Sequence, residues 1–73
     1  MAREIKLLDT VALLQDLPDS GLLRGQVGTV VEELAPGVFE VEFSDDQGRT
    51  YAARAVDSSR LLGLVYEVVG SAE

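Results

Sequence analysis

Residues 26–43 read QVGTVVEELAPGVFEVEF. The end of this stretch alternates apolar and acidic residues, which is the period of a strand with one buried face. In an extended chain one side carries Phe39, Val41 and Phe43, and the other side carries Glu40 and Glu42. The alternation therefore predicts a strand over residues 38–43 that packs its aromatic side against a core.

A turn separates this strand from a valine-rich one predicted over residues 26–34. In Ala35-Pro36-Gly37, proline fixes φ at the first corner of the turn and glycine permits a positive φ at the second. Gly25 and Gly28 flank the start of the valine-rich strand, where they indicate a positive φ or a close approach of two backbones. Residues 26–43 thus predict a β-hairpin.

Turn residues recur along the rest of the chain at intervals typical of small all-β proteins. They delimit further predicted strands over residues 6–14, 49–56 and 61–69. Asp57-Ser58-Ser59-Arg60 predicts a short 3-10 turn before the last strand, because Asp and Ser cap free amide groups. We predict an all-β fold, a small five-stranded SH3-like barrel, with an OB-like barrel as the alternative. The predicted core consists of Val11, Leu13, Val30, Phe39, Val41, Phe43, Val56 and Leu61.

Length and composition limit what this fold can do. Seventy-three residues predict a single SH3-like domain, 1–73, with a core over about residues 5–69 and frayed termini. The chain contains no Cys, His or Trp, which excludes disulfides, zinc and haem sites and a Ser–His–Asp triad. The four serines outside the termini have no base beside them in the sequence, so we expect no enzyme activity and no cofactor or metal.

The formal net charge of -7 limits the partners. Such a chain repels nucleic-acid phosphates and anionic membranes, so both are disfavoured partners. The longest apolar runs are far shorter than the roughly 20 residues of a membrane span. The absence of Cys fits a reducing, cytoplasmic location.

Most of the chain resembles a known family. Residues 8–18 read LDTVALLQDLP, and residues 21–32 read GLLRGQVGTVVE. This resembles a family of short bacterial proteins known only as a domain of unknown function, with the pattern D-x-V-A-L-L-x-D-L-P followed by G-x-x-G-T-V-V-E. The resemblance covers about residues 5–64. It implies a stand-alone SH3-like protein, often encoded beside another small protein, and hence an antitoxin-like or immunity-like binder of that partner. Arg54, where the family tends to be apolar, and the chain beyond Leu64 depart from the pattern.

Four carboxylates lie on the two strands of the predicted hairpin: Glu32, Glu33, Glu40 and Glu42. Depending on the strand register, two of them lie directly opposite each other, which is destabilising for like charges. We interpret them as a solvated face or, more specifically, as an acidic patch that binds a basic protein partner.

The end of the chain is more apolar than a small barrel needs. In the predicted strand over residues 61–69, Leu64, Tyr66 and Val68 alternate along the chain. An exposed edge strand of this kind invites pairing with another chain, either as a homodimer or higher oligomer or with a partner protein. The alternative is that the strand only closes the barrel.

Together these features predict a non-catalytic protein-binding module, the acidic antitoxin- or immunity-like member of a two-protein bacterial system. Two alternatives stay open. One is a structural or regulatory subunit of a larger assembly. The other, which the single Arg24 near the glycine-rich bend disfavours, is an RNA-associated SH3-like module.

Overall fold

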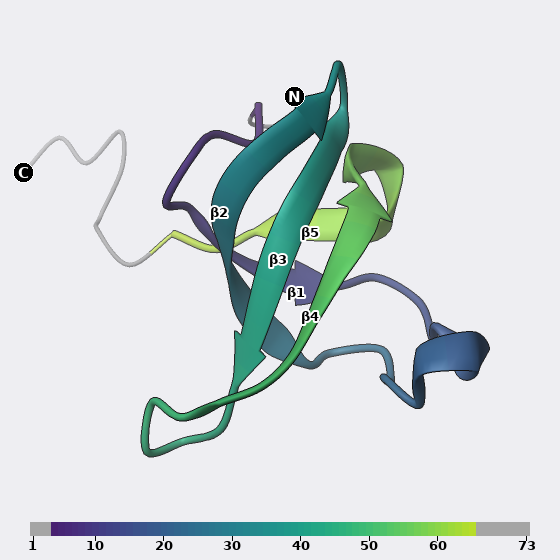
Figure 1. Cartoon of the computed structure of the whole chain (residues 1–73), viewed down its shortest axis with the longest axis vertical. Coiled ribbons are helices and arrows are strands. Elements are labelled where there is room, and N and C mark those ends of the chain that lie inside the picture. The colour runs from purple at the N-terminus through teal and green to yellow at the C-terminus, as the bar shows by residue number, and fades with distance from the viewer. Residues whose placement is uncertain (1–3, 66–73) are drawn as a thin grey trace, which may run out of the picture.

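The computed structural model describes residues 4–65 and confirms an all-β fold (Figure 1). Five antiparallel strands form one sheet in the order β4-β3-β2-β1-β5. The strands and two 3-10 turns are, in chain order, β1 (Thr10–Leu13), η1 (Pro18–Ser20), β2 (Val27–Ala35), β3 (Val38–Ser44), β4 (Thr50–Asp57), η2 (Ser58–Arg60) and β5 (Leu61–Gly63). Within these residues no helix is long and apolar enough to cross a membrane.

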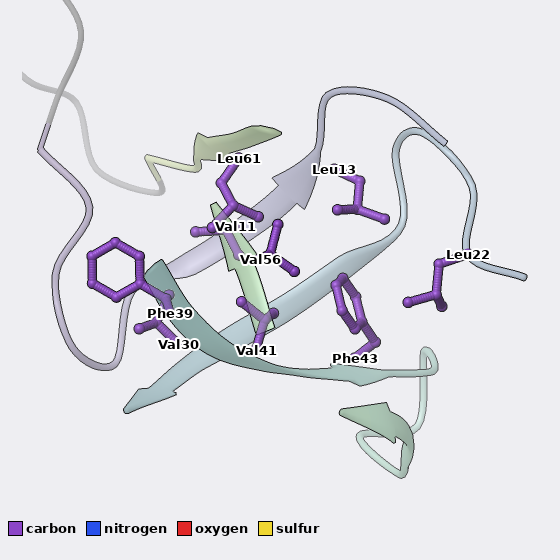
Figure 2. Packing of buried hydrophobic residues seen from close by; sticks show 9 residues of the cluster. All are labelled: Val11, Leu13, Leu22, Val30, Phe39, Val41, Phe43, Val56 and Leu61. Atoms are coloured by element: carbon purple, nitrogen blue, oxygen red, sulfur yellow. The ribbon is translucent and has the colours of Figure 1, made fainter. Parts of the chain in front are cut away.

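The core lies between β1 and β5 on one side and β2 and β3 on the other (Figure 2). All eight residues predicted for the core are buried, and so is Leu22, which lies in the loop between β1 and β2. Ile5, Leu17 and Ala52 pack against the edges of this cluster. The alternation along β3 therefore located the inner face of the sheet correctly.

The β2–β3 hairpin forms as the sequence predicts. Ala35 pairs with Val38, and Pro36 and Gly37 make the turn between them. Gly37 has a φ of 77°, the left-handed conformation that the second corner requires. The backbone N–H of Ser58 donates to the Gly37 carbonyl at 2.8 Å, so the turn is fixed to η2.

The first strand is shorter than predicted. We expected a strand over residues 6–14, but residues 6–9 form a turn and β1 begins at Thr10. The Asp9 side chain accepts a hydrogen bond from the Lys6 N–H at 2.8 Å, and the Asp9 N–H donates to the Lys6 carbonyl at 3.1 Å. Leu8 has a φ of 71° and donates to the Val30 carbonyl at 2.8 Å. An Asp side chain that accepts a hydrogen bond from a preceding backbone N–H competes with the hydrogen bonds between strands. Here the strand therefore begins only after Asp9.

The last strand is also shorter than predicted. We expected a strand over residues 61–69, but β5 ends at Gly63, and Leu64 and Val65 are not in a strand. The Leu64 N–H still donates to the Thr10 carbonyl at 2.9 Å. Residues 66–69 lie outside the described residues.

A closed barrel is not confirmed. The sheet curls around the core, and η2 connects β4 directly to β5, but these two edge strands do not pair with each other in the described part of the chain. The predicted 3-10 turn is confirmed, with the Asp57 side chain accepting a hydrogen bond from the Ser59 N–H.

The long loop between β1 and β2 is held by hydrogen bonds within itself and by one from the sheet. The Leu17 N–H donates to the Leu22 carbonyl at 2.8 Å, and the Asp16 carboxylate accepts from the Arg24 N–H at 2.8 Å. From the sheet, the Arg54 side chain donates to the Ser20 hydroxyl at 3.1 Å. These contacts hold the loop over one end of the core.

Asp45 organises the tip of the β3–β4 hairpin. Its Oδ1 accepts hydrogen bonds from the backbone N–H of Arg49 at 3.0 Å and of Gln47 at 2.9 Å. Its Oδ2 lies 3.2 Å from Arg49 Nε. The backbone donors of Arg49 and Gln47 hold the pKa of Asp45 below its ordinary value.

We expect the Asp45→Asn variant to be less stable than the wild type near neutral pH, with the difference disappearing in acid. A carboxyl group whose folded pKa is lowered adds stability above its unfolded pKa, about 4. That contribution is lost as the pH falls through the folded pKa. Urea unfolding at about pH 6 and about pH 2 measures the effect, with Asp46→Asn at the neighbouring exposed carboxylate as the control. A stability difference that is equal at both pH values would contradict the prediction.

Candidate functional site

Three carboxylates lie on the outer face of the sheet. Strand alternation places Glu40 and Glu42 opposite the side that carries the buried residues of β3. The register places Glu40 directly across from Glu32 and Glu42 directly across from Thr29. We call Glu32, Glu40 and Glu42 the acidic face.

A β-bulge produces this arrangement. The register between β2 and β3 shifts after the Val30–Val41 pair, so that Val31 is left over and Glu32 is the next residue to pair, with Glu40. Without the extra residue, Val31 would have occupied the position opposite Glu40. Bulges commonly re-aim a side chain in this way. The expectation that two carboxylates lie opposite each other is therefore met by Glu32 and Glu40.

Among the described residues no ion pair involves a carboxylate of the acidic face. The ion pair found there, between Arg49 and Asp45, lies at the hairpin tip and involves none of its carboxylates. On the other side of β3, Glu42 pairs with Ala53 and Glu40 with Ala55, and these small side chains leave the carboxylates uncovered. Glu32 and Glu42 are exposed and Glu40 is half-buried. The face is a negative surface that is largely exposed to solvent.

The remaining carboxylate of the predicted patch lies elsewhere. Glu33 pairs with Phe39, whose side chain is buried on the inner side of the sheet, so Glu33 is not part of the acidic face. Glu32 and Glu33 both line a groove at the end of the sheet. Strand alternation places the two consecutive glutamates on opposite sides of β2, and the bulge decides that Glu32 rather than Glu33 faces Glu40.

This groove has a volume of about 840 Å³ and lies between residues 4–7, the β2–β3 hairpin and the start of β5. Its apolar lining comes from residues far apart in sequence: Ile5, Leu7, Val31, Phe39 and Leu61. Figure 2 shows the Phe39 ring at the end of the core opposite Phe43 and Leu22, where the N-terminal chain passes. The sequence pattern does not predict the groove.

The apolar residues predicted for pairing with another chain are only partly described. Leu64 is half-buried and follows β5, while Tyr66 and Val68 lie outside the described residues. In β5 itself, Leu62 is half exposed and pairs with Ala12. Across residues 4–65 no group of three or more Asp or Glu side chains is arranged to hold a metal ion.

A family model, described as a domain of unknown function (DUF4926), matches residues 7–62. The chain belongs to this family. The DUF4926 match runs from Leu7 to Leu62 and therefore includes the bulge, the acidic face and most of the groove lining. No curated protein and no solved structure matches the chain.

Proposed function

We propose that this DUF4926 protein is a non-catalytic protein-binding module whose acidic face binds a basic surface of a protein partner. In this proposal it is the acidic, antitoxin-like or immunity-like member of a two-protein bacterial system in the cytoplasm. One observation carries the proposal: two glutamates, Glu32 and Glu40, are paired across neighbouring strands, and neither forms an ion pair among the described residues.

The physical argument concerns the cost of that pair. Like charges directly opposite each other in a sheet destabilise it by about 0.2–1 kcal/mol relative to neutral residues. Glu42, one alternation further along β3, adds to the same negative field. A partner with Lys or Arg side chains at this surface would turn the repulsion into attraction. The net charge of -7 would also steer such a partner during diffusion.

The arrangement of the strands supports an SH3-like module. The strand order β4-β3-β2-β1-β5, with a 3-10 turn between β4 and β5, is compatible with a five-stranded barrel of this class, in which the edge strands β4 and β5 would come together. We propose that the sheet belongs to this class, in which loops and exposed sheet surfaces bind partners around a small fixed core.

The test compares two double variants that remove the same amount of charge. Glu40→Gln/Glu42→Gln empties the β3 part of the acidic face, and Asp19→Asn/Asp46→Asn removes two exposed carboxylates from the η1 loop and the hairpin tip. Each is mixed with the purified proteins encoded on either side of its gene. Association rates are measured by biolayer interferometry at low and high salt. We expect the first variant to associate about tenfold more slowly at low salt and the control to behave like the wild type.

Stability measurements keep this test interpretable. Removing Glu40 also removes the like-charged pair with Glu32, so the first variant should be as stable as the wild type or slightly more stable. Slower association would then not result from unfolding. If neither neighbouring protein binds, or if the wild type and both variants associate at one salt-independent rate, the proposal is wrong.

A further inference from the structure

We propose that the groove beside the acidic face accepts one large apolar side chain from a lysine- or arginine-rich segment of the partner. This inference rests on the proposed function and deepens it. The partner segment would carry a large apolar side chain, here called the anchor, between cationic side chains. The anchor would lie in the groove.

The groove has the size and lining of a binding pocket. Its volume of about 840 Å³ is within the range of ligand pockets. Phe39 and Leu61 belong to the buried core, and Ile5 packs against that core, so these walls are supported from behind. Leu7, in contrast, has 59% of its surface exposed although it lines the groove. A large apolar side chain entering the groove would cover surface that the described residues leave open to water.

A strained turn holds Leu7 in position. Leu8, the next residue, has a φ of 71°, which is unfavourable for an L-residue other than Asn or Asp. The turn is kept in place by the hydrogen bonds between Lys6 and Asp9 and by the Leu8 N–H donating to the Val30 carbonyl. Strain that the surrounding structure maintains is a common feature of binding sites. Here the turn directs the exposed Leu7 and Leu8 away from the core and places Leu7 in the groove wall.

The charge around the groove selects the occupant. Among the described residues three glutamates line it, Glu4, Glu32 and Glu33, against one cation, Lys6. Glu32 belongs to both the groove and the acidic face, so the two surfaces are continuous. An apolar cavity with a mostly negative rim next to a negative face favours a segment that carries an apolar side chain between Lys or Arg residues. The same rim repels anionic ligands.

The absence of Trp from this chain allows a direct test. The probe is a seven-residue peptide with a central tryptophan and three lysines on each side, and its companion has glycine in place of tryptophan. Entry of the tryptophan into the groove shifts its fluorescence to shorter wavelength, whereas contact of the lysines with the acidic face does not. We expect the blue shift, and we expect the tryptophan peptide to bind about tenfold more tightly than the glycine peptide.

A matched pair of variants locates the site. Leu7→Ser alters the groove wall, and Leu23→Ser alters a residue on the β1–β2 loop with the same exposed fraction, 59%. Because both side chains are largely exposed, both variants should fold, which circular dichroism verifies. We expect Leu7→Ser to weaken the tryptophan peptide about threefold or more without affecting the glycine peptide, and Leu23→Ser to affect neither.

Three results would overturn the inference. Equal binding of the two peptides, or equal effects of Leu7→Ser and Leu23→Ser, would mean that the groove does not hold the anchor. Binding of the tryptophan peptide only after deletion of residues 66–73 would assign the groove to the chain's own C-terminal segment. The proposed function is tested separately, because Glu40 and Glu42 do not line the groove and their variant leaves its walls unchanged.

Discussion

Replacing Gly28 by alanine is expected to destabilise the protein by about 3 kcal/mol or more. Gly28 is buried in β2 and pairs with Val11 on one side and Phe43 on the other. A Cβ at this position would lie 2.7 Å from the Glu42 carbonyl oxygen and 2.7 Å from Val41 Cγ1. The carbonyl belongs to the β3 backbone, which cannot move without disturbing the sheet. A domain of this size has only about 4–10 kcal/mol of stability, so the loss would be a large part of it.

The control for this variant is the same substitution in another strand. At Gly63 in β5, a Cβ would lie 3.4 Å from the end of the flexible Ile5 side chain, an ordinary contact. Gly63→Ala should therefore stay within about 0.5 kcal/mol of the wild type or gain slightly from reduced freedom of the unfolded chain. Urea unfolding followed by circular dichroism compares the two. Equal midpoints for both variants would show that β2 and β3 are not in close contact at Gly28.

Most of the sheet could be predicted from the sequence, because strand alternation and turn residues are visible over short stretches of chain. Alternation identified the buried side of β3, and the Pro36-Gly37 pair identified the turn that precedes it. The glycines around the start of β2 were predicted to permit a positive φ or a close approach. Gly25, with a φ of 91°, does the first and Gly28 does the second.

The ends of β1 and β5 were predicted less well. Composition does not reveal that the Asp9 side chain accepts a hydrogen bond from the Lys6 backbone. It also does not reveal that β1, the antiparallel partner of β5, begins only at Thr10, so that β1 does not extend alongside the residues that follow Gly63. A strand continues only where a neighbour supplies hydrogen-bonding groups, and that neighbour is set by the fold as a whole. Both predicted strands were therefore too long.

The candidate site was predictable in composition but not in geometry. The sequence shows glutamates on both strands of a hairpin, yet the extra residue at Val31 decides that Glu32 faces Glu40 while Glu33 does not join them. The groove had no sequence signal, because its lining residues, such as Leu7 and Phe39, are far apart in the sequence and only the folded chain brings them to one groove.

Replacing Leu22 by alanine is expected to cost about 2–4 kcal/mol, although this residue lies in a loop. Its side chain is only 3% exposed and belongs to the core cluster (Figure 2). The sequence does not reveal this burial, because a loop has no periodicity that would distinguish Leu22 from Leu23, which is exposed. The loop is fixed by the bridge between Leu17 and Leu22, so the cavity left by the substitution cannot close easily.

The matched control for Leu22→Ala is Leu23→Ala, which removes the same atoms from the next residue and should change stability by less than about 0.5 kcal/mol. Urea unfolding of the two variants side by side measures the difference. If the two costs are equal, the β1–β2 loop does not contribute to the core. A large cost at Leu22 alone would show that this loop is part of the hydrophobic core, so that changes within it affect the sheet that carries the acidic face.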